Sequence, residues 1–254
     1  MINKTYYFEG SFCGIRLGNI GENIRSSTGK GVKIGVIDSG WDRSLIDCRV
    51  RKGIGLVDPE DELLLKVSSD DNDLNGHGTA CTEIILRIAP DSSIYPIKVF
   101  GKNIETSPNI LIEGINRAIK RKLKILSISL GTLRPEVLKP LYKICEIARR
   151  KKMILVSAKS NVDISSFPAV FENVIGVESG NIENIFKYEI LKNEGIECKA
   201  MGEFDNVCTL SGKRIKLSGN SLACAVMTGI IALHLQISPN ANLNGIRKLL
   251  QKEL

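Results

Sequence analysis

Short apolar runs alternate with amphipathic segments along this chain of 254 residues. Unbroken apolar runs bounded by polar residues are typical of strands that are buried on both faces, as in parallel sheets. The pattern predicts such strands at residues 33–37, 94–99, 125–130, 153–158 and 174–177.

Segments with helical spacing of apolar residues separate these strands. One begins at Ser107-Pro108, a capping residue followed by a proline that suits the first helical position. Others cover residues 136–150 and 244–252, and the apolar stretch 222–235 is expected to be a buried helix, too short to span a bilayer. The alternation predicts an α/β fold, a three-layer, doubly wound, mostly parallel sheet with helices on both faces. No linker or repeat interrupts it, so residues 1–254 are expected to form a single domain.

Sheets of this kind bind ligands beyond the carboxyl ends of their strands. Three segments with reactive side chains fall at such positions. Asp38 ends the first strand, His77 opens a helical segment within Asn-Gly-His-Gly-Thr, and Ser221 opens the apolar helix within Ser-Gly-Asn-Ser-Leu-Ala. We therefore expect these three side chains to meet at one edge of the sheet.

An acid, an imidazole and a hydroxyl in one place suit nucleophilic catalysis. A serine hydroxyl needs a neighbouring base, histidine has a suitable pKa, and a carboxylate orients the imidazole. His77 is the expected base, because His234, the other histidine, falls inside the apolar helix. Backbone N–H groups at the start of the Ser221 helix, together with the Asn161 amide, would stabilise an oxyanion.

The order of Asp38, His77 and Ser221, in the contexts IDSG, GHGT and GNSLA, resembles the subtilisin-like (S8, subtilase) serine peptidases. The similarity runs from about Gly31 to Leu235 and implies the same catalytic roles for the three residues. Asn161 matches the family's oxyanion asparagine, and Phe167-Pro168-Ala169 resembles an element whose proline is cis in the family.

The resemblance also implies the substrate-binding residues. The run SISLGT resembles the segment that pairs with the substrate backbone, and the run SAKSN resembles the oxyanion segment, which lies beside the primary specificity pocket in the family. The residues implied in this way are Ser129, Leu130, Gly131, Ala158, Lys159 and Ser160. Lys159 and Ser160 stand where relatives usually have Ala and Gly. Two hypotheses for Lys159 are open, selection of an acidic substrate residue and a solvent-facing side chain.

The segment around Ser221 departs from the family, whose usual motif is Gly-Thr-Ser-Met-Ala. Ala225 takes the place of a proline, which would relax the first helical turn. Extra room there would let an amine compete with water for the acyl-enzyme, giving peptide-ligase character. Ordinary sequence drift within a helix is the simpler interpretation.

No cofactor or metal is expected. The connection after His77 lacks the calcium-binding loop of many relatives, and a single carboxylate, Asp47, stands near another family calcium position. The run Asp70-Asp71-Asn72-Asp73 favours an acidic solvated loop, with calcium binding as the alternative. About 30 residues precede the first strand, so we expect no inhibitory propeptide.

The formal charge of +7 raises the question of a polyanionic partner. The basic clusters at 120–124 and 149–152 end helical patterns, where cations complement the helix dipole, so we expect neither nucleic-acid nor membrane binding. Seven scattered cysteines indicate free thiols rather than disulfides, and residues 1–10 lack the apolar core of a secretory signal. A cytoplasmic location fits best.

The resemblance implies a serine endopeptidase that acts on peptides or proteins. A dedicated role in maturing a peptide precursor, such as leader removal, is our finer hypothesis. The alternatives are a pseudopeptidase that binds peptides without cleaving them and the ligase described above. A nucleotide-binding α/β protein is disfavoured, because no Gly-x-Gly-x-x-Gly loop follows a strand. The sequence leaves the oligomeric state open.

Overall fold

The computed structural model describes residues 16–19, 21, 24, 26–56, 65–160, 166–191 and 195–252. The strands of the main sheet are β1 (Arg16–Asn19), β2 (Lys33–Asp38), β3 (Ile54–Gly55), β4 (Ser93–Lys98), β5 (Ile125–Ile128), β6 (Ile154–Ala158), β7 (Ile175–Gly180), β8 (Lys187–Ile190) and β9 (Cys198–Met201). A separate hairpin comprises β10 (Glu203–Cys208) and β11 (Arg214–Ser218). The longer helices are α2 (His77–Ile88), α3 (Pro108–Lys120), α4 (Leu138–Arg150), α5 (Asn220–Ile237) and α6 (Leu243–Lys252).

Within the described residues the main sheet has nine strands in the order β1-β8-β9-β7-β6-β5-β2-β4-β3. Its centre, from β7 to β3, is parallel throughout, with Ile125 of β5 paired to Ile34 of β2 on one side and to Ile154 of β6 on the other. The five predicted strands are all present. The main difference is that β5 ends at Ile128, two residues earlier than predicted.

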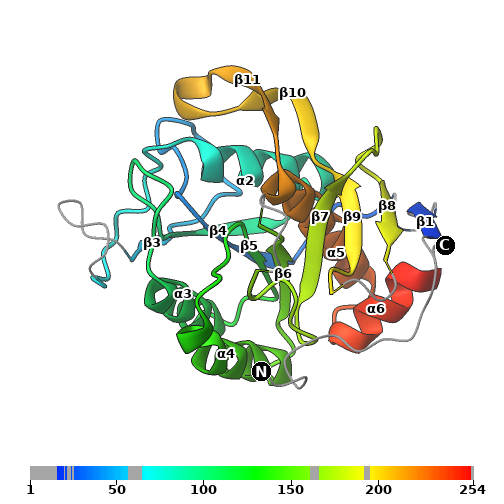
Figure 1. Ribbon diagram of the computed structural model, residues 1–254. Coiled ribbons are helices and arrows are strands. Elements are labelled where there is room, and N and C mark those ends of the chain that lie inside the picture. Colours follow the sequence, from blue (N-terminus) through cyan, green and yellow to red (C-terminus); the bar gives the residue numbers. More distant parts are fainter. Residues whose placement is uncertain are drawn as a thin grey trace.

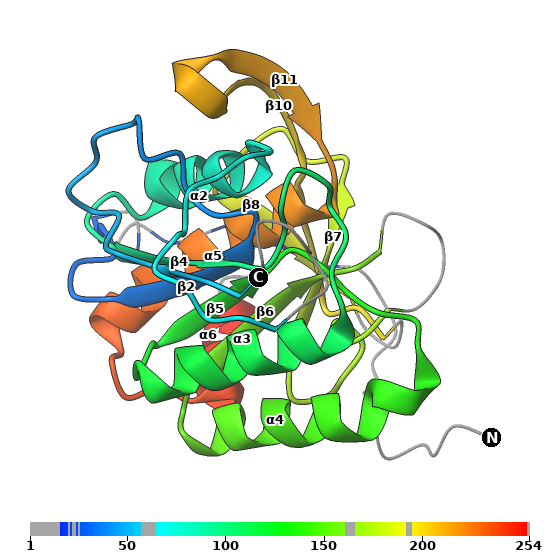
Figure 2. The same cartoon turned by 90° about the vertical axis from the view of Figure 1, so that its left-hand side faces the viewer.

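Helices cover both faces of this sheet, as predicted (Figures 1 and 2). One hydrophobic core joins α2, α5 and α6 to inward-facing residues such as Val36 and Val156. A second core joins α3 and α4 to Ile37 and Leu155, which point to the opposite face. Successive residues of one strand therefore pack into different cores, so both faces of the strand are buried. This explains why the strands are apolar runs rather than alternating patterns. That all 254 residues form one domain stays a prediction.

Helix α5 is apolar on every side and occupies the interior. It is longer than the predicted segment, with 18 residues, and 83% of that stretch is buried inside the fold. By length and composition alone it could cross a membrane, but here it packs against α2 and strands β5, β6, β7 and β9. A helix without a polar face is expected at the centre of a fold. The N-terminus of α5 lies at the edge of the sheet where the parallel strands end.

The sequence pattern missed the antiparallel parts of the fold. Strand β8 pairs antiparallel with both β1 and β9 at one end of the sheet, and β10 and β11 form a hairpin above α2 (Figure 1). Strands β8 to β11 have four to six residues, and half-buried or exposed positions interrupt each of them. Such segments lack the unbroken apolar run that identified the central strands.

Candidate active site

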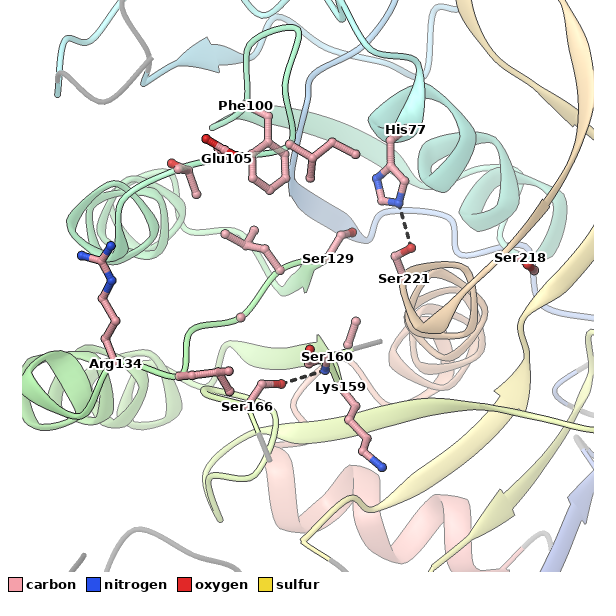
Figure 3. Close-up of a pocket in the computed structure, with 16 residues that line it drawn as sticks. His77, Phe100, Glu105, Ser129, Arg134, Lys159, Ser160, Ser166, Ser218 and Ser221 are labelled. Atoms are coloured by element: carbon pink, nitrogen blue, oxygen red, sulfur yellow. Dashed lines mark hydrogen bonds between the residues drawn. The ribbon is translucent and has the colours of Figure 1, made fainter. Parts of the chain in front are cut away.

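The side chains of interest come from neighbouring elements at one edge of the sheet. Asp38 is the last residue of β2, Ser129 follows β5, and Ala158 ends β6. His77 opens α2 and Ser221 lies in the first turn of α5. The parallel strands all end on this side, so residues far apart in the chain gather around one cleft (Figure 3).

The turn before His77 is built around a buried carboxylate. Asp73 accepts hydrogen bonds from the backbone N–H groups of Asn75, Gly76 and Thr79, at 2.8–2.9 Å, and from the Thr79 hydroxyl at 2.7 Å. This carboxylate therefore satisfies the N–H groups that open α2 and that lack helical partners. Gly78 allows close packing there, because a Cβ at this position would lie 2.4 Å from the carbonyl oxygen of Gly40.

Asp38, His77 and Ser221 form a continuous hydrogen-bond relay. The His77 Nδ1 lies 2.8 Å and 3.0 Å from the two carboxylate oxygens of Asp38, and its Nε2 lies 2.8 Å from the Ser221 Oγ. Since Nδ1 faces a carboxylate, it carries the proton, which leaves Nε2 free to accept one from the serine hydroxyl. The structure thus brings together the three residues that the sequence singled out.

The charges of this relay are coupled. Burial favours the protonated form of Asp38, but the positive charge of His77 and hydrogen bonds from His77, Ser129 and Ser39 outweigh it and lower the pKa of the carboxyl. Burial likewise opposes the imidazolium form of His77, yet the negative charge of Asp38 raises its pKa well above the ordinary value of 6.5. A carboxylate in this position stabilises the imidazolium that forms when a proton leaves the serine.

Ser221 itself is 7% exposed and sits next to the N-terminus of α5. Gly219, the residue before the helix, has a φ of 151°, which favours glycine and allows the sharp entry from β11. The first N–H groups of a helix have no partner in a preceding turn and carry the positive end of its dipole. Negative charge that develops beside Ser221 therefore faces favourable donors.

The predicted substrate-binding residues all line one cleft of about 700 Å³ that also contains His77 and Ser221. The ammonium group of Lys159 points away from the cleft, which agrees better with the solvent-facing hypothesis than with selection of an acidic substrate residue (Figure 3). Neither hypothesis anticipated its ion pair with Glu178, at 2.9 Å. Asn161, the expected oxyanion donor, lies outside the described residues. The Phe167-Pro168 peptide bond is cis, as the resemblance implied.

Sequence reasoning missed a thiol beneath the relay. The Sγ of Cys81 lies 3.9 Å from the His77 Nδ1, and the Ser129 hydroxyl lies 3.8 Å from that sulfur. The position of Cys81, four residues after His77 on a helix, was the available signal, since such residues share a face.

Asp38, His77 and Cys81 are close enough to hold a metal ion, with their ligand atoms within 4.8 Å of one another. Their chemistry favours a hydrogen-bonded group instead. Burial raises the pKa of the Cys81 thiol, which disfavours the thiolate that metals require, and Asp38 already engages the His77 Nδ1.

The acidic run is neither a solvated loop nor a set of open calcium ligands. Asp71 is buried, where it binds the guanidinium of Arg43, and Asp73 is occupied by the turn described above. Asp70 accepts from the ammonium of Lys98 at 3.1 Å. Asp47, the other candidate, is paired with Arg49. Protein donors therefore already engage these carboxylates.

Comparison with known proteins agrees with this geometry. The model of the subtilase family matches residues 29–254. An intracellular serine protease of Paenibacillus polymyxa is 30% identical, covering 89% of this chain and 72% of that protein. The major intracellular serine protease of Bacillus subtilis (strain 168) is 29% identical, over 81% and 68% respectively. A crystal structure of a cold adapted subtilisin-like serine proteinase superposes with a TM-score of 0.71 at 20% identity, over 89% of this chain and 83% of that one. The chain therefore belongs to the subtilase family and is a subtilisin-like serine endopeptidase.

Proposed function

We propose that Ser221 is the nucleophile, His77 the general base and Asp38 the residue that orients the imidazole. The observation that carries this proposal is the relay from Asp38 through His77 to Ser221, closed at 2.8 Å on each side of the ring. Ser221 attacks the peptide carbonyl as its proton passes to Nε2, and His77 then returns that proton to the leaving amine. Water repeats the sequence on the acyl-enzyme and releases the product.

The oxyanion of each tetrahedral intermediate would be held by the Ser221 N–H and the side chain of Asn161. The start of α5 supports the first donor. The second donor rests on the family resemblance alone, in which Asn161 matches the oxyanion asparagine. A substrate chain would lie extended along Ser129, Leu130 and Gly131, whose backbone follows β5 along the cleft wall.

Labelling with a fluorophosphonate probe tests the nucleophile. The folded wild-type protein should react at Ser221, and Ser221→Ala should neither react nor cleave peptides. A folded wild-type protein that stays unlabelled would instead favour the pseudopeptidase, which binds peptides in the same cleft without cleaving them.

A finer proposal concerns the substrate and its location. We infer that this peptidase matures a peptide precursor in the cytoplasm and needs no cofactor. Free thiols support the location, since the six described cysteines are all unpaired, and two relatives are named intracellular. A dedicated processing enzyme should cut an unfolded protein such as reduced casein at few positions, and digestion at many positions would contradict this role.

Ligase character is the remaining alternative, suggested by Ala225. This residue is fully buried in the second turn of α5. Product ratios measured with an added amine nucleophile would test it. Aminolysis above the rate of a matched Ala225→Pro variant would support a ligase, and equal ratios in the two proteins would contradict it.

A further inference from the structure

A narrow slot opens beside Ser221, between the chain segments that follow β5 and β6. The two strands pair as far as Ile128 and Ser157, and then each segment follows a different neighbour. Beyond that pair, the N–H of Ser129 donates to Ile37 of β2 at 3.4 Å, whereas the N–H of Lys159 donates to Val177 of β7 at 2.8 Å. The segments therefore diverge, and both line the cleft that holds Ser221.

Ser166 closes the inner end of this slot. Its hydroxyl oxygen accepts a hydrogen bond from the N–H of Ser160 at 2.8 Å, which fixes it to one wall (Figure 3). A Cβ placed on Gly131, in the opposite wall, would lie 3.2 Å from the Ser166 Cβ. Ser166 thus spans the gap between the walls, and it is 1% exposed.

Ser166 forms the floor of the slot, and backbone hydrogen bonds hold the segment that carries it in place. Phe167 exchanges two hydrogen bonds with Thr132, at 2.8 Å and 3.0 Å, which anchors the segment carrying Ser166 to the first wall. The second wall is fixed from outside the slot, where the Asn220 amide donates to the carbonyl oxygens of Lys159 and Ser160. Widening the slot would therefore require breaking several hydrogen bonds at once.

The slot offers neither a countercharge nor a deep apolar surface among its described residues. The Lys159 ammonium is turned outward to Glu178. Arg134 and Glu105 line the same cleft but lie at its far end from Ser221 (Figure 3). A long apolar side chain would bury the Ser166 hydroxyl against hydrocarbon, which costs free energy, and a charged side chain would find no partner of opposite charge among the described residues beside Ser166.

The slot corresponds to the primary specificity pocket that the family resemblance implies, and we propose that Ser166 restricts the substrate residue immediately before the cleaved bond to Gly, Ala or Ser. This inference rests on the proposed function, because it assumes acylation at Ser221. It defines the substrate class as peptides with a small uncharged residue at the cleavage point.

The test uses peptides of one sequence that differ only in the residue before the cleaved bond. Wild-type protein should cleave the Ala peptide with a kcat/KM about tenfold or more above that of the Phe peptide, and the Glu and Lys peptides should be poor substrates. Ser166→Gly removes the floor and should raise the Phe-to-Ala ratio about tenfold. Ser166→Thr adds a methyl group and should lower the Ala-to-Gly ratio, so a second variant remains if the glycine protein fails to fold.

A matched serine-to-glycine control is available at Ser211, which is exposed on the β10–β11 turn and has a φ of 55°, a conformation that suits glycine. Ser211→Gly should leave all ratios unchanged. Wild-type protein that cleaves Phe and Ala peptides equally, or folded Ser166 variants with unchanged ratios, would overturn the inference. Fluorophosphonate labelling separates the two proposals, since labelled protein without this preference contradicts the slot alone, whereas unlabelled wild-type protein contradicts the peptidase mechanism itself.

Discussion

The side-chain amide of Asn220 donates a hydrogen bond to the carbonyl oxygen of Ser160 over 3.0 Å. The same amide donates to Lys159 at 3.1 Å, and its oxygen accepts from the N–H of Ser179 at 2.8 Å. These bonds tie the residue before Ser221 to the end of β6, from which the chain continues to Asn161. Family members usually have threonine here, whose shorter side chain has one hydroxyl in place of an amide. Asn220 therefore fixes the chain before Ser221 relative to Lys159 and Ser160, and under the proposed mechanism it is a positioning residue.

Replacing Asn220 should damage catalysis more than binding. In Asn220→Ala the two segments lose their connection, and small displacements of reacting groups cost about 100-fold in rate. We expect kcat to fall by about that factor while KM changes by less than about threefold. Asn220→Asp keeps an acceptor for Ser179 but cannot donate to the two carbonyl groups, so it should resemble the alanine variant. A wild-type kcat in folded Asn220→Ala protein would contradict the positioning role.

The pH dependence of activity should report the ionisation of His77. Only the neutral imidazole can accept the Ser221 proton, and Asp38 raises the pKa of His77 well above 6.5. The rate should therefore increase with pH through that pKa, and the inflection in kcat/KM should lie on the alkaline side of 6.5.

Asp38→Asn provides the matched comparison for this profile. An amide cannot stabilise the imidazolium, so the inflection should move to lower pH, and the plateau rate should fall by about 10⁴-fold. An unchanged inflection in the variant would show that the titrating group is not His77.

Calcium should have little effect on stability. The carboxylates of Asp70, Asp71 and Asp47 are each paired with a Lys or Arg side chain, and Asp73 is saturated by donors from its own turn. A ligand raises Tm only when it binds the folded state, so adding calcium or a chelator should shift Tm by less than about 1 °C. Magnesium at equal ionic strength controls for charge screening. A saturable increase in Tm that is specific to calcium would overturn this expectation.

The sequence predicted the parts of this molecule that are encoded locally. Unbroken apolar runs identified the central strands, and the polar residues at their ends, such as Asp38, identified the edge of the sheet that carries the site. The sequence offered no prediction for contacts that depend on the order of the strands in the sheet. Strand β7 pairs with β9 rather than with β8, and Lys159 binds Glu178 on the adjacent β7, relationships that no local pattern expresses.

Buried polar groups were also hard to recognise in the sequence. Cys81 lies in an apolar helix and looked like an ordinary core residue, yet it is within 3.9 Å of the His77 ring. Ser166 precedes the cis-proline element and carried no signal of its own, yet it closes the slot beside Ser221. Both roles arise from elements that meet only after folding.

His234 should make the fold sensitive to acid. It is 1% exposed within α5, and neither ring nitrogen has a hydrogen-bond partner among the described residues. Burial lowers the pKa of His234 from 6.5 to about 4. Because the unfolded chain binds this proton more readily, the free energy of unfolding should fall as the pH drops from 6.5 toward 4.

His234→Leu should remove this sensitivity. The gain in unfolding free energy relative to wild type should be about 2 kcal/mol larger at about pH 5 than at about pH 8, from the size of the pKa change. Urea unfolding at the two pH values measures this difference, and a Ser221→Ala background in both proteins excludes self-digestion. An equal gain at both pH values would show that His234 costs stability only through its unpaired nitrogens and does not take up a proton on unfolding.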